Sequence, residues 1–301
     1  MDSDTELNAA VNNVRAFLRD HVTGFGKDGS FINQILKVDK VLLYAMVLYS
    51  YKFDYLINNR YNESVLQSKY ELFKNRKQLL QGSDSLDCLY NKKIYLYAVN
   101  YFFGNVVNFD QFVSQVFNVT NILFNCKTFA VKKAFNVKRV IVVQRHMLPD
   151  VVLLDNKKLT SFTLQSNIED PSFSTLMGYI LKKVPENHVE LRNTPQEYIV
   201  LELTVVLNAG LYILPVYECT VDSNELELVL LPQEYGYRVE SVKKRPPVYL
   251  VDSKDLGNDF NAADRMYHRD DGRSRVSRAI PRIEYILSAF TLMNIPLQDL
   301  F

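Results

Sequence analysis

Histidine and cysteine are the side chains that most often bind metals, and their spacing in this sequence does not fit a metal site. The four histidines and three cysteines are widely separated: His21, His146, His188, His268, Cys88, Cys126 and Cys219. None forms the close pairs that zinc sites use, such as Cys-x-x-Cys. The cysteines cannot pair completely, so a disulfide scaffold is excluded and a reducing compartment is expected. The sequence predicts no metal and no cofactor.

Two further motifs of enzyme chemistry are also missing. The stretch from Gly24 to Gly29 is rich in glycine, but it follows an expected helix and lacks the Gly-Lys-Ser/Thr ending of a phosphate-binding loop. The sequence has no Gly-x-Ser-x-Gly elbow for a nucleophilic serine. We therefore interpret residues 24–29 as a turn.

Asp150 stands in an order of expected elements that has a chemical meaning. Strands are expected at 137–144, 151–154 and 159–165, with Pro149-Asp150 between the first two, and a helix at 172–184 precedes a strand from Tyr198. This order resembles that of PD-(D/E)xK nucleases, in which the aspartate and an acid on the following strand bind a divalent metal, and a lysine two residues further assists the attacking water. The strand at 159–165 has neither acid nor lysine. The resemblance therefore implies an inactive nuclease whose surface is used for binding.

Charge is distributed unevenly along a chain whose formal net charge is only +1. Residues 127–148 carry six basic side chains and no acid, and residues 264–282 carry six arginines against three aspartates. Between them, residues 186–240 carry ten acids against two arginines. These segments could neutralise one another in the fold, join copies of the chain head to tail, or bind a polyanion through cations with aromatic neighbours such as Phe129 and Tyr267.

The candidate nucleic-acid-binding residues are the cations of the two basic segments. They are Lys132, Lys133, Lys138, Arg139, Arg145, Arg265, Arg269, Arg273, Arg275 and Arg278. If they line one surface, the chain is a non-enzymatic binding or assembly protein that self-associates or coats single-stranded DNA or RNA. Its 19 tyrosines, 18 phenylalanines and lack of tryptophan suggest a structural or replication-accessory protein of a large DNA virus.

The first part of the chain has the apolar spacing of helices. Leu7, Val11, Val14 and Leu18 form one helical stripe, and Asp39 begins an apolar stretch of helical length. Further helices are expected at 63–81, from an N-cap at Asp84 or Ser85 through Leu89 to Phe103, and, with Asn108 as the N-cap, at 109–117. Residues 1–126 should form a helical domain.

The pattern then changes to short alternating or β-branched runs, typical of strands. They lie at 137–144, 150–155, 159–165, 198–208, 211–221, 225–231, 237–243 and 248–251. A mainly antiparallel sheet with one inserted helix should occupy residues 127–255. Residues 256–301 should add the basic segment and a closing helix, with Pro281 in its first turn and Ile283, Ile286, Leu287, Phe290 and Met293 on its buried face. The fold class is α+β.

Composition sets the outer limits of these predictions. With 301 residues, 48% of them hydrophobic, the chain can fold into one large domain or two modest ones. The acidic start is unlike a signal peptide, and no apolar run is long enough to span a bilayer. We expect an intracellular protein, in the cytoplasm, nucleus or a virion. The apolar tail 297–301 could dock in a protein partner.

Overall fold

The computed structural model describes residues 3–25, 35, 39–76, 89–164, 197–219, 226–249 and 279–292. The chain forms two compact units. The first comprises Met1–Lys133, Asp155–Ser161 and Ala209–Glu234, and the second comprises Ala134–Leu154, Phe162–Asn208 and Tyr235–Phe301. No helix of the described ranges is long and apolar enough to cross a membrane.

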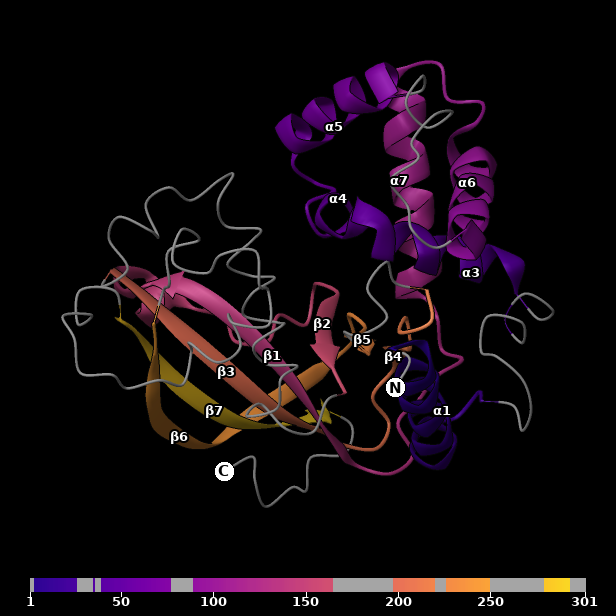
Figure 1. The fold of residues 1–301 in the computed structure, drawn as a ribbon. Helices are drawn as coiled ribbons and strands as arrows, with labels where there is room; N and C mark the ends of the chain where they lie inside the picture. The colour runs from indigo at the N-terminus through magenta and orange to yellow at the C-terminus, as the bar shows by residue number, and fades with distance from the viewer. Residues whose placement is uncertain are drawn as a thin grey trace. The chain divides into compact units, whose positions relative to one another are not determined.

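Helices make up most of the first unit (Figure 1). They are α1 (Ser3–His21), α3 (Lys40–Leu48), the π-helix η1 (Tyr49–Phe53), α4 (Asp54–Asn58), α5 (Glu63–Arg76), α6 (Leu89–Phe103) and α7 (Phe109–Phe124). Helix α7 packs against α3, α4, α5 and α6.

The helical spacing of the sequence explains why α7 is central. Its stripe of Phe112, Val116, Val119 and Leu123 is buried. Asn108 caps the helix as predicted, because its Oδ1 accepts a hydrogen bond from the Gln111 backbone N at 2.9 Å. The ring of Phe112 packs 5.6 Å from that of Phe103, centroid to centroid, so aromatic contacts fix the helical layer.

A small β structure belongs to the same unit. Strand β4 (Ile213–Leu214) pairs antiparallel with β5 (Glu227–Leu230), with Ile213 opposite Leu230. The Gln233 amide closes this pair, because it accepts from Tyr212 N and donates to Tyr212 O, both at 2.9 Å. The first half of β2 (Thr160–Thr163) also belongs to the first unit.

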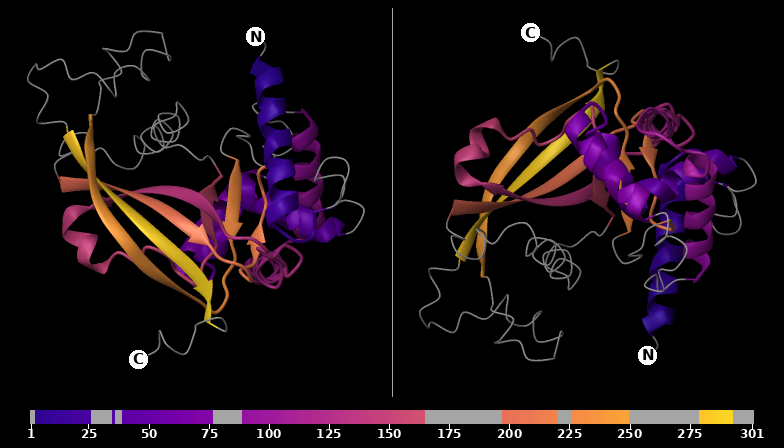
Figure 2. Two further views of the ribbon diagram at one scale, coloured as in Figure 1. Left: turned by 90° about the horizontal axis from the view of Figure 1, so that it is seen from below. Right: turned by 90° about the horizontal axis from the view of Figure 1, so that it is seen from above.

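The second unit is built on four long strands (Figure 2). They are β1 (Phe135–Gln144), β3 (Tyr198–Leu207), β6 (Tyr235–Tyr249) and β7 (Ala279–Thr291). Strands β1 and β3 are antiparallel, β3 and β7 are parallel, and β7 and β6 are antiparallel. Hydrogen bonding gives the order β4-β5-β2-β1-β3-β7-β6 for the seven strands. The α+β class with N-terminal helices and a central, mixed sheet is thus confirmed.

The predicted closing helix is wrong, because residues 279–291 form strand β7. Ile283, Ile286, Leu287 and Phe290 do have helical spacing, but β3 and β6 hydrogen-bond to the two edges of β7 and hold it extended. A short apolar run in a strand cannot be distinguished from a buried helix by periodicity alone. The predicted helix at 172–184 lies outside the described residues.

Other strand boundaries also differ from the prediction. Residues 145–150 form a short 3-10 helix, η2 (Arg145–Asp150), and no strand follows it at 151–154. The runs predicted at 237–243 and 248–251 are one strand, β6, interrupted by a register shift between Arg245 and Val248. Pro246 and Pro247 lie in this shift. Because proline has no backbone N–H, its place in an interruption of the regular pairing avoids two missing hydrogen bonds between β6 and β7.

Candidate functional site

The structure describes five of the ten cations that the sequence analysis selected. Lys132 and Lys133 are exposed, and the Lys132 Nζ donates to Arg19 O at 2.6 Å. Lys138 and Arg139 are neighbours on β1, so their side chains leave opposite faces of the strand. Arg145 is exposed in η2, where its Nε lies 3.5 Å from Tyr198 O. The other five, Arg265, Arg269, Arg273, Arg275 and Arg278, lie outside the described residues.

The one described arginine of the segment 264–282 is engaged inside the second unit. The Arg282 side chain is 12% exposed and donates to the Glu202 carboxylate, which is 1% exposed. On the neighbouring strand β6, Arg245 Nη2 lies 2.9 Å from Glu284 Oε2. Glu202 and Glu284 are partners in the β3–β7 register. Each arginine neutralises one of these two acids, which would otherwise repel each other.

Asp150 does not stand in a nuclease-like arrangement. It is exposed at the end of η2, and the strand that should follow it is missing. Strand β2 reads Thr-Ser-Phe-Thr and supplies no acid. The described residues contain no group of three His, Cys, Asp or Glu side chains placed to hold a metal ion.

A hydroxyl and a carboxylate from distant parts of the sequence meet in the first unit. Ser161 Oγ donates a hydrogen bond of 2.5 Å to Glu227 Oε1. In β2, Thr160 and Phe162 are buried while Ser161 is half-buried, because alternate side chains face opposite sides of a strand. Glu227 is the half-buried first residue of β5, followed by buried Leu228. Both members of the pair are thus half-buried, and Val229, on the same face of β5 as Glu227, is fully buried.

The backbone just before Glu227 adopts an unusual conformation. Leu226 has a φ of 43°, and it is the only described residue other than glycine with a positive φ. A side chain with a Cβ is strained there, so the surrounding structure must hold this conformation. Such strain is typical of functional sites.

A buried turn follows β4, the strand that pairs with β5. Residues 217–219 form this turn, in which Cys219 is 1% exposed and its N donates to Val216 O at 2.7 Å. Burial raises the pKa of the Cys219 thiol, and the negative charges of Glu218 and Glu227 raise it further. A buried thiol whose pKa is raised stays protonated at neutral pH, which is typical of a cysteine that packs in a core.

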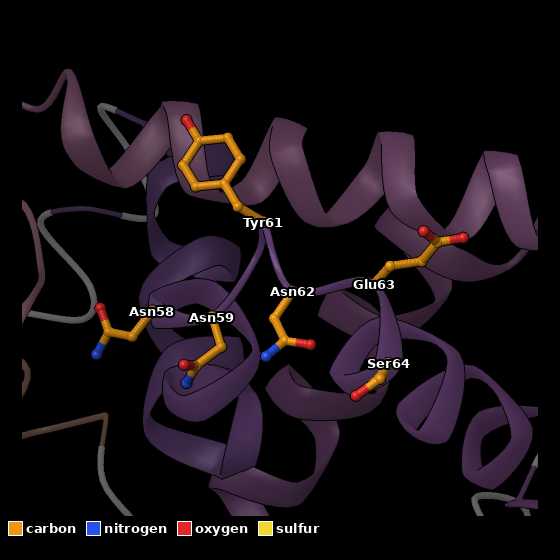
Figure 3. A pocket seen from close by; sticks show the side chains of 6 residues that line it. All are labelled: Asn58, Asn59, Tyr61, Asn62, Glu63 and Ser64. Atoms are coloured by element: carbon orange, nitrogen blue, oxygen red, sulfur yellow. The ribbon is translucent and has the colours of Figure 1, made fainter.

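A shallow hollow of about 560 Å³ lies between α4 and α5, lined by Asn58, Asn59, Tyr61, Asn62, Glu63 and Ser64 (Figure 3). Its amides already have structural partners. Asn62 Oδ1 accepts from Val65 N at 3.3 Å, and Asn59 Nδ2 donates to Tyr55 O at 2.8 Å. The hollow is therefore a weaker candidate than the Ser161–Glu227 pair.

Sequence reasoning missed this pair, although it predicted both strands. Ser161 is one of several hydroxyl side chains in the run 159–165, and Glu227 is one of ten acids in the segment 186–240. The sequence did contain one signal, which is an acidic residue directly before the apolar run of a strand. Only the fold shows which hydroxyl it meets.

No family model and no curated protein matches the chain. Among solved structures, the chain is similar to ADP-ribosyltransferase Vis in complex with agmatine, with 12% identity, coverage of 99% of this chain and 90% of that chain, and a TM-score of 0.39. It is also similar to the Vis toxin of Vibrio splendidus, with 10% identity, coverage of 98% and 90%, and a TM-score of 0.35. At TM-scores this low, the likeness does not by itself assign an activity to this chain.

The prediction of a non-enzymatic viral structural or nucleic-acid-binding protein is wrong. The solved structures that match are of ADP-ribosyltransferases, not of nucleic-acid-binding or assembly proteins. The inactive-nuclease alternative is contradicted by the same finding. The prediction also depended on open, unneutralised cations, whereas Arg282 is buried against Glu202. The predicted partners and cell compartment stay predictions, and the tail 297–301 lies outside the described residues.

Proposed function

We propose that the chain is an enzyme that transfers ADP-ribose from NAD⁺ to an acceptor, with Glu227 as the catalytic carboxylate and Ser161 as the residue that orients it. The observation that carries the proposal is the 2.5 Å hydrogen bond from Ser161 Oγ to Glu227 Oε1. The serine hydroxyl fixes one carboxylate oxygen, so the side chain is held in one orientation before substrate binds. Preorganised charge of this kind is the largest single contribution to many enzyme rates.

A fixed carboxylate suits chemistry at the anomeric carbon of a sugar. Breaking a glycosidic bond develops positive charge on that carbon, and a nearby carboxylate stabilises it. Most glycosidases need a second carboxyl group to protonate the leaving group. The nicotinamide of NAD⁺ is already cationic and leaves as a neutral molecule, so one oriented carboxylate is sufficient. The chemistry of the pair thus favours a nicotinamide riboside bond over an ordinary O-glycoside.

The proposed reaction balances without a further reagent. The bond between the ribose C1′ and the nicotinamide N1 breaks, and its electron pair leaves with nicotinamide. A bond forms between C1′ and a nucleophilic atom of the acceptor, or of water, which loses one proton to solvent. Glu227 stabilises the positive charge at C1′, and its half-buried position reduces the screening of that interaction by water.

The test is nicotinamide release from NAD⁺ by the purified chain, measured by chromatography, together with transfer of labelled ADP-ribose to a mixed protein acceptor. Glu227→Gln keeps the size of the side chain and removes its charge. We expect the release rate to fall by about 10²–10³-fold, as when one transition-state contact is removed from other enzymes. Glu234→Gln, an exposed acid of the same unit, is the matched control and should leave the rate unchanged.

Two results would overturn the proposal. One is a wild-type chain that releases no more nicotinamide than a blank. The other is a folded Glu227→Gln variant, by circular dichroism, that retains the wild-type rate.

A further inference from the structure

Two side chains of the helical layer hold the backbone on either side of the Ser161–Glu227 pair. Asn58, the last residue of α4, contacts the segment before Ser161. Arg15, on α1, contacts the turn before Glu227. Both contacts join residues more than 100 positions apart, and both lie inside the first unit.

Asn58 acts on β2 as a neighbouring strand would. Its Nδ2 donates to Leu159 O at 3.2 Å, and its Oδ1 accepts from Leu159 N at 3.0 Å. One amide thus satisfies both backbone groups of a single residue, two positions before Ser161. Because Leu159 directly precedes β2, this contact fixes the backbone where that strand of four residues begins.

Arg15 acts on the turn at residues 217–219. Its Nε lies 2.6 Å from Glu218 Oε1, and the two side chains are 25% and 6% exposed. The hydrogen bond to Glu218 raises the pKa of Arg15. The pair is charge-assisted and largely removed from water, where such bonds are strong.

The turn held by Arg15 follows β4, and β4 pairs with β5, the strand that begins with Glu227, with Leu214 opposite Val229. The charge of Glu227 also contributes to the raised pKa of Cys219 in this turn. Leu226, directly before Glu227, has a φ of 43° that its surroundings must maintain. A turn that loosens at the end of β4 would weaken the β4–β5 pairing that holds this backbone.

We infer that Asn58 and Arg15 are positioning residues that together set the distance between Ser161 and Glu227. Asn58 holds the backbone before Ser161, and Arg15 holds the turn that comes before Glu227 in the sequence. This inference rests on the proposed function for its kinetic consequences. Neither side chain needs to touch a substrate. Each acts through the backbone of the strand or turn that it holds, and a misplacement of about 1 Å at a reacting group can cost roughly 10²-fold in rate.

The experiment compares Asn58→Ala and Arg15→Met with the controls Asn59→Ala and Arg19→Met. Asn59 follows Asn58, but its amide only donates to Tyr55 O in its own helix, and Arg19 lies one turn after Arg15 with its Nε on Arg15 O. We expect the two test variants to lower kcat for nicotinamide release by about 10- to 100-fold with KM within about twofold. The controls should match the wild type.

A second measurement does not depend on activity. In native protein, hydrogen exchange at Leu159 should accelerate in Asn58→Ala, and alkylation of Cys219, followed by mass spectrometry, should accelerate in Arg15→Met. Arg15→Lys, which keeps the charge, should restore part of both kcat and Cys219 protection. Glu218→Gln removes the ion pair from the other side and replaces Arg15→Met if that variant does not fold.

The outcomes separate the two proposals. If the wild type releases no nicotinamide, the proposed function fails, while the exchange and alkylation rates still show whether the backbone is held. If the wild type is active and the test variants keep its kcat, the positioning inference fails, whether or not the backbone has loosened.

Discussion

In the first unit, the Arg15–Glu218 pair joins a helix to a turn, whereas in the second unit Arg282–Glu202 and Arg245–Glu284 join neighbouring strands of one sheet. In all three pairs the acidic side chain is buried, with 6%, 1% and 7% exposed for Glu218, Glu202 and Glu284. The strand pairs lie in regular backbone that already has its own hydrogen bonds, and the Arg15 pair lies where the backbone is irregular.

The difference shows two uses of buried charge. In the sheet, Glu202 stands opposite Glu284, and each arginine can satisfy its acid only in the observed register. A slip by one residue would turn each acid to the other face of its strand. In the first unit, the pair selects the position of a turn beside a carboxylate. The ion pairs of the sheet specify the fold, whereas the ion pair at the turn holds the backbone in one position, as a reactive site requires.

The largest effect should come from Arg282→Met. This change leaves Glu202, which is 1% exposed, as a buried carboxylate without its partner, and we expect a loss of about 3–5 kcal/mol in the free energy of unfolding. Urea unfolding followed by circular dichroism measures it. Lys244→Met, at an exposed position of β6, is the control. The double variant Arg282→Met, Glu202→Leu should recover much of the loss, and no recovery would contradict the explanation by an unpaired charge.

A smaller loss is expected for Arg245→Met. Its side chain is 39% exposed, so water screens the pair, and Thr204 Oγ1 still donates to Glu284 at 3.3 Å. We expect about 1–2 kcal/mol in the same urea experiment. A loss equal to that of Arg282→Met would show that burial does not determine which of the two pairs contributes more to the free energy of unfolding.

The N-cap of α7 gives a reference without an ion pair. Asn108→Ala removes the acceptor for Gln111 N and should cost about 1 kcal/mol. Asn121→Ala, exposed within the same helix, should cost nothing or stabilise slightly. Equal losses at the two positions would mean that the cap contributes little to the first unit.

The smallest effect belongs to the Arg238–Glu240 pair on β6. Its side chains are 61% and 39% exposed, at a distance of 3.0 Å. Arg238→Met should change the free energy of unfolding by less than about 0.5 kcal/mol. The attraction between two exposed charges is only slightly stronger than the interaction of each charge with water. A loss above 1 kcal/mol would require this pair to be covered in solution.

Local patterns predicted the elements whose stability is local. Helix α6 ends at Phe103 as predicted, and Asn108 caps α7 as expected. Residues 279–291 were wrongly predicted as a helix, because the spacing of their apolar side chains is compatible with both a helix and a strand. Their state is decided by two strands that are distant in sequence, and no local pattern contains that information.

The candidate site lies further beyond sequence reasoning. The two residues that meet are 66 positions apart, and their types are common in this chain. The cationic residues stood out instead because charge runs are visible in one dimension. Arg282 shows the weakness of that signal, since its partner Glu202 lies 80 positions away and neutralises it.

The place of β7 between β3 and β6 has a consequence for how the protein is made. A ribosome produces β3 first, then β6, and only afterwards the strand that joins them. Until β7 emerges, Glu202 has no arginine and Glu284 is not yet present. The edge of β3 that β7 covers in the folded protein therefore stays unpaired until the last strand has been made.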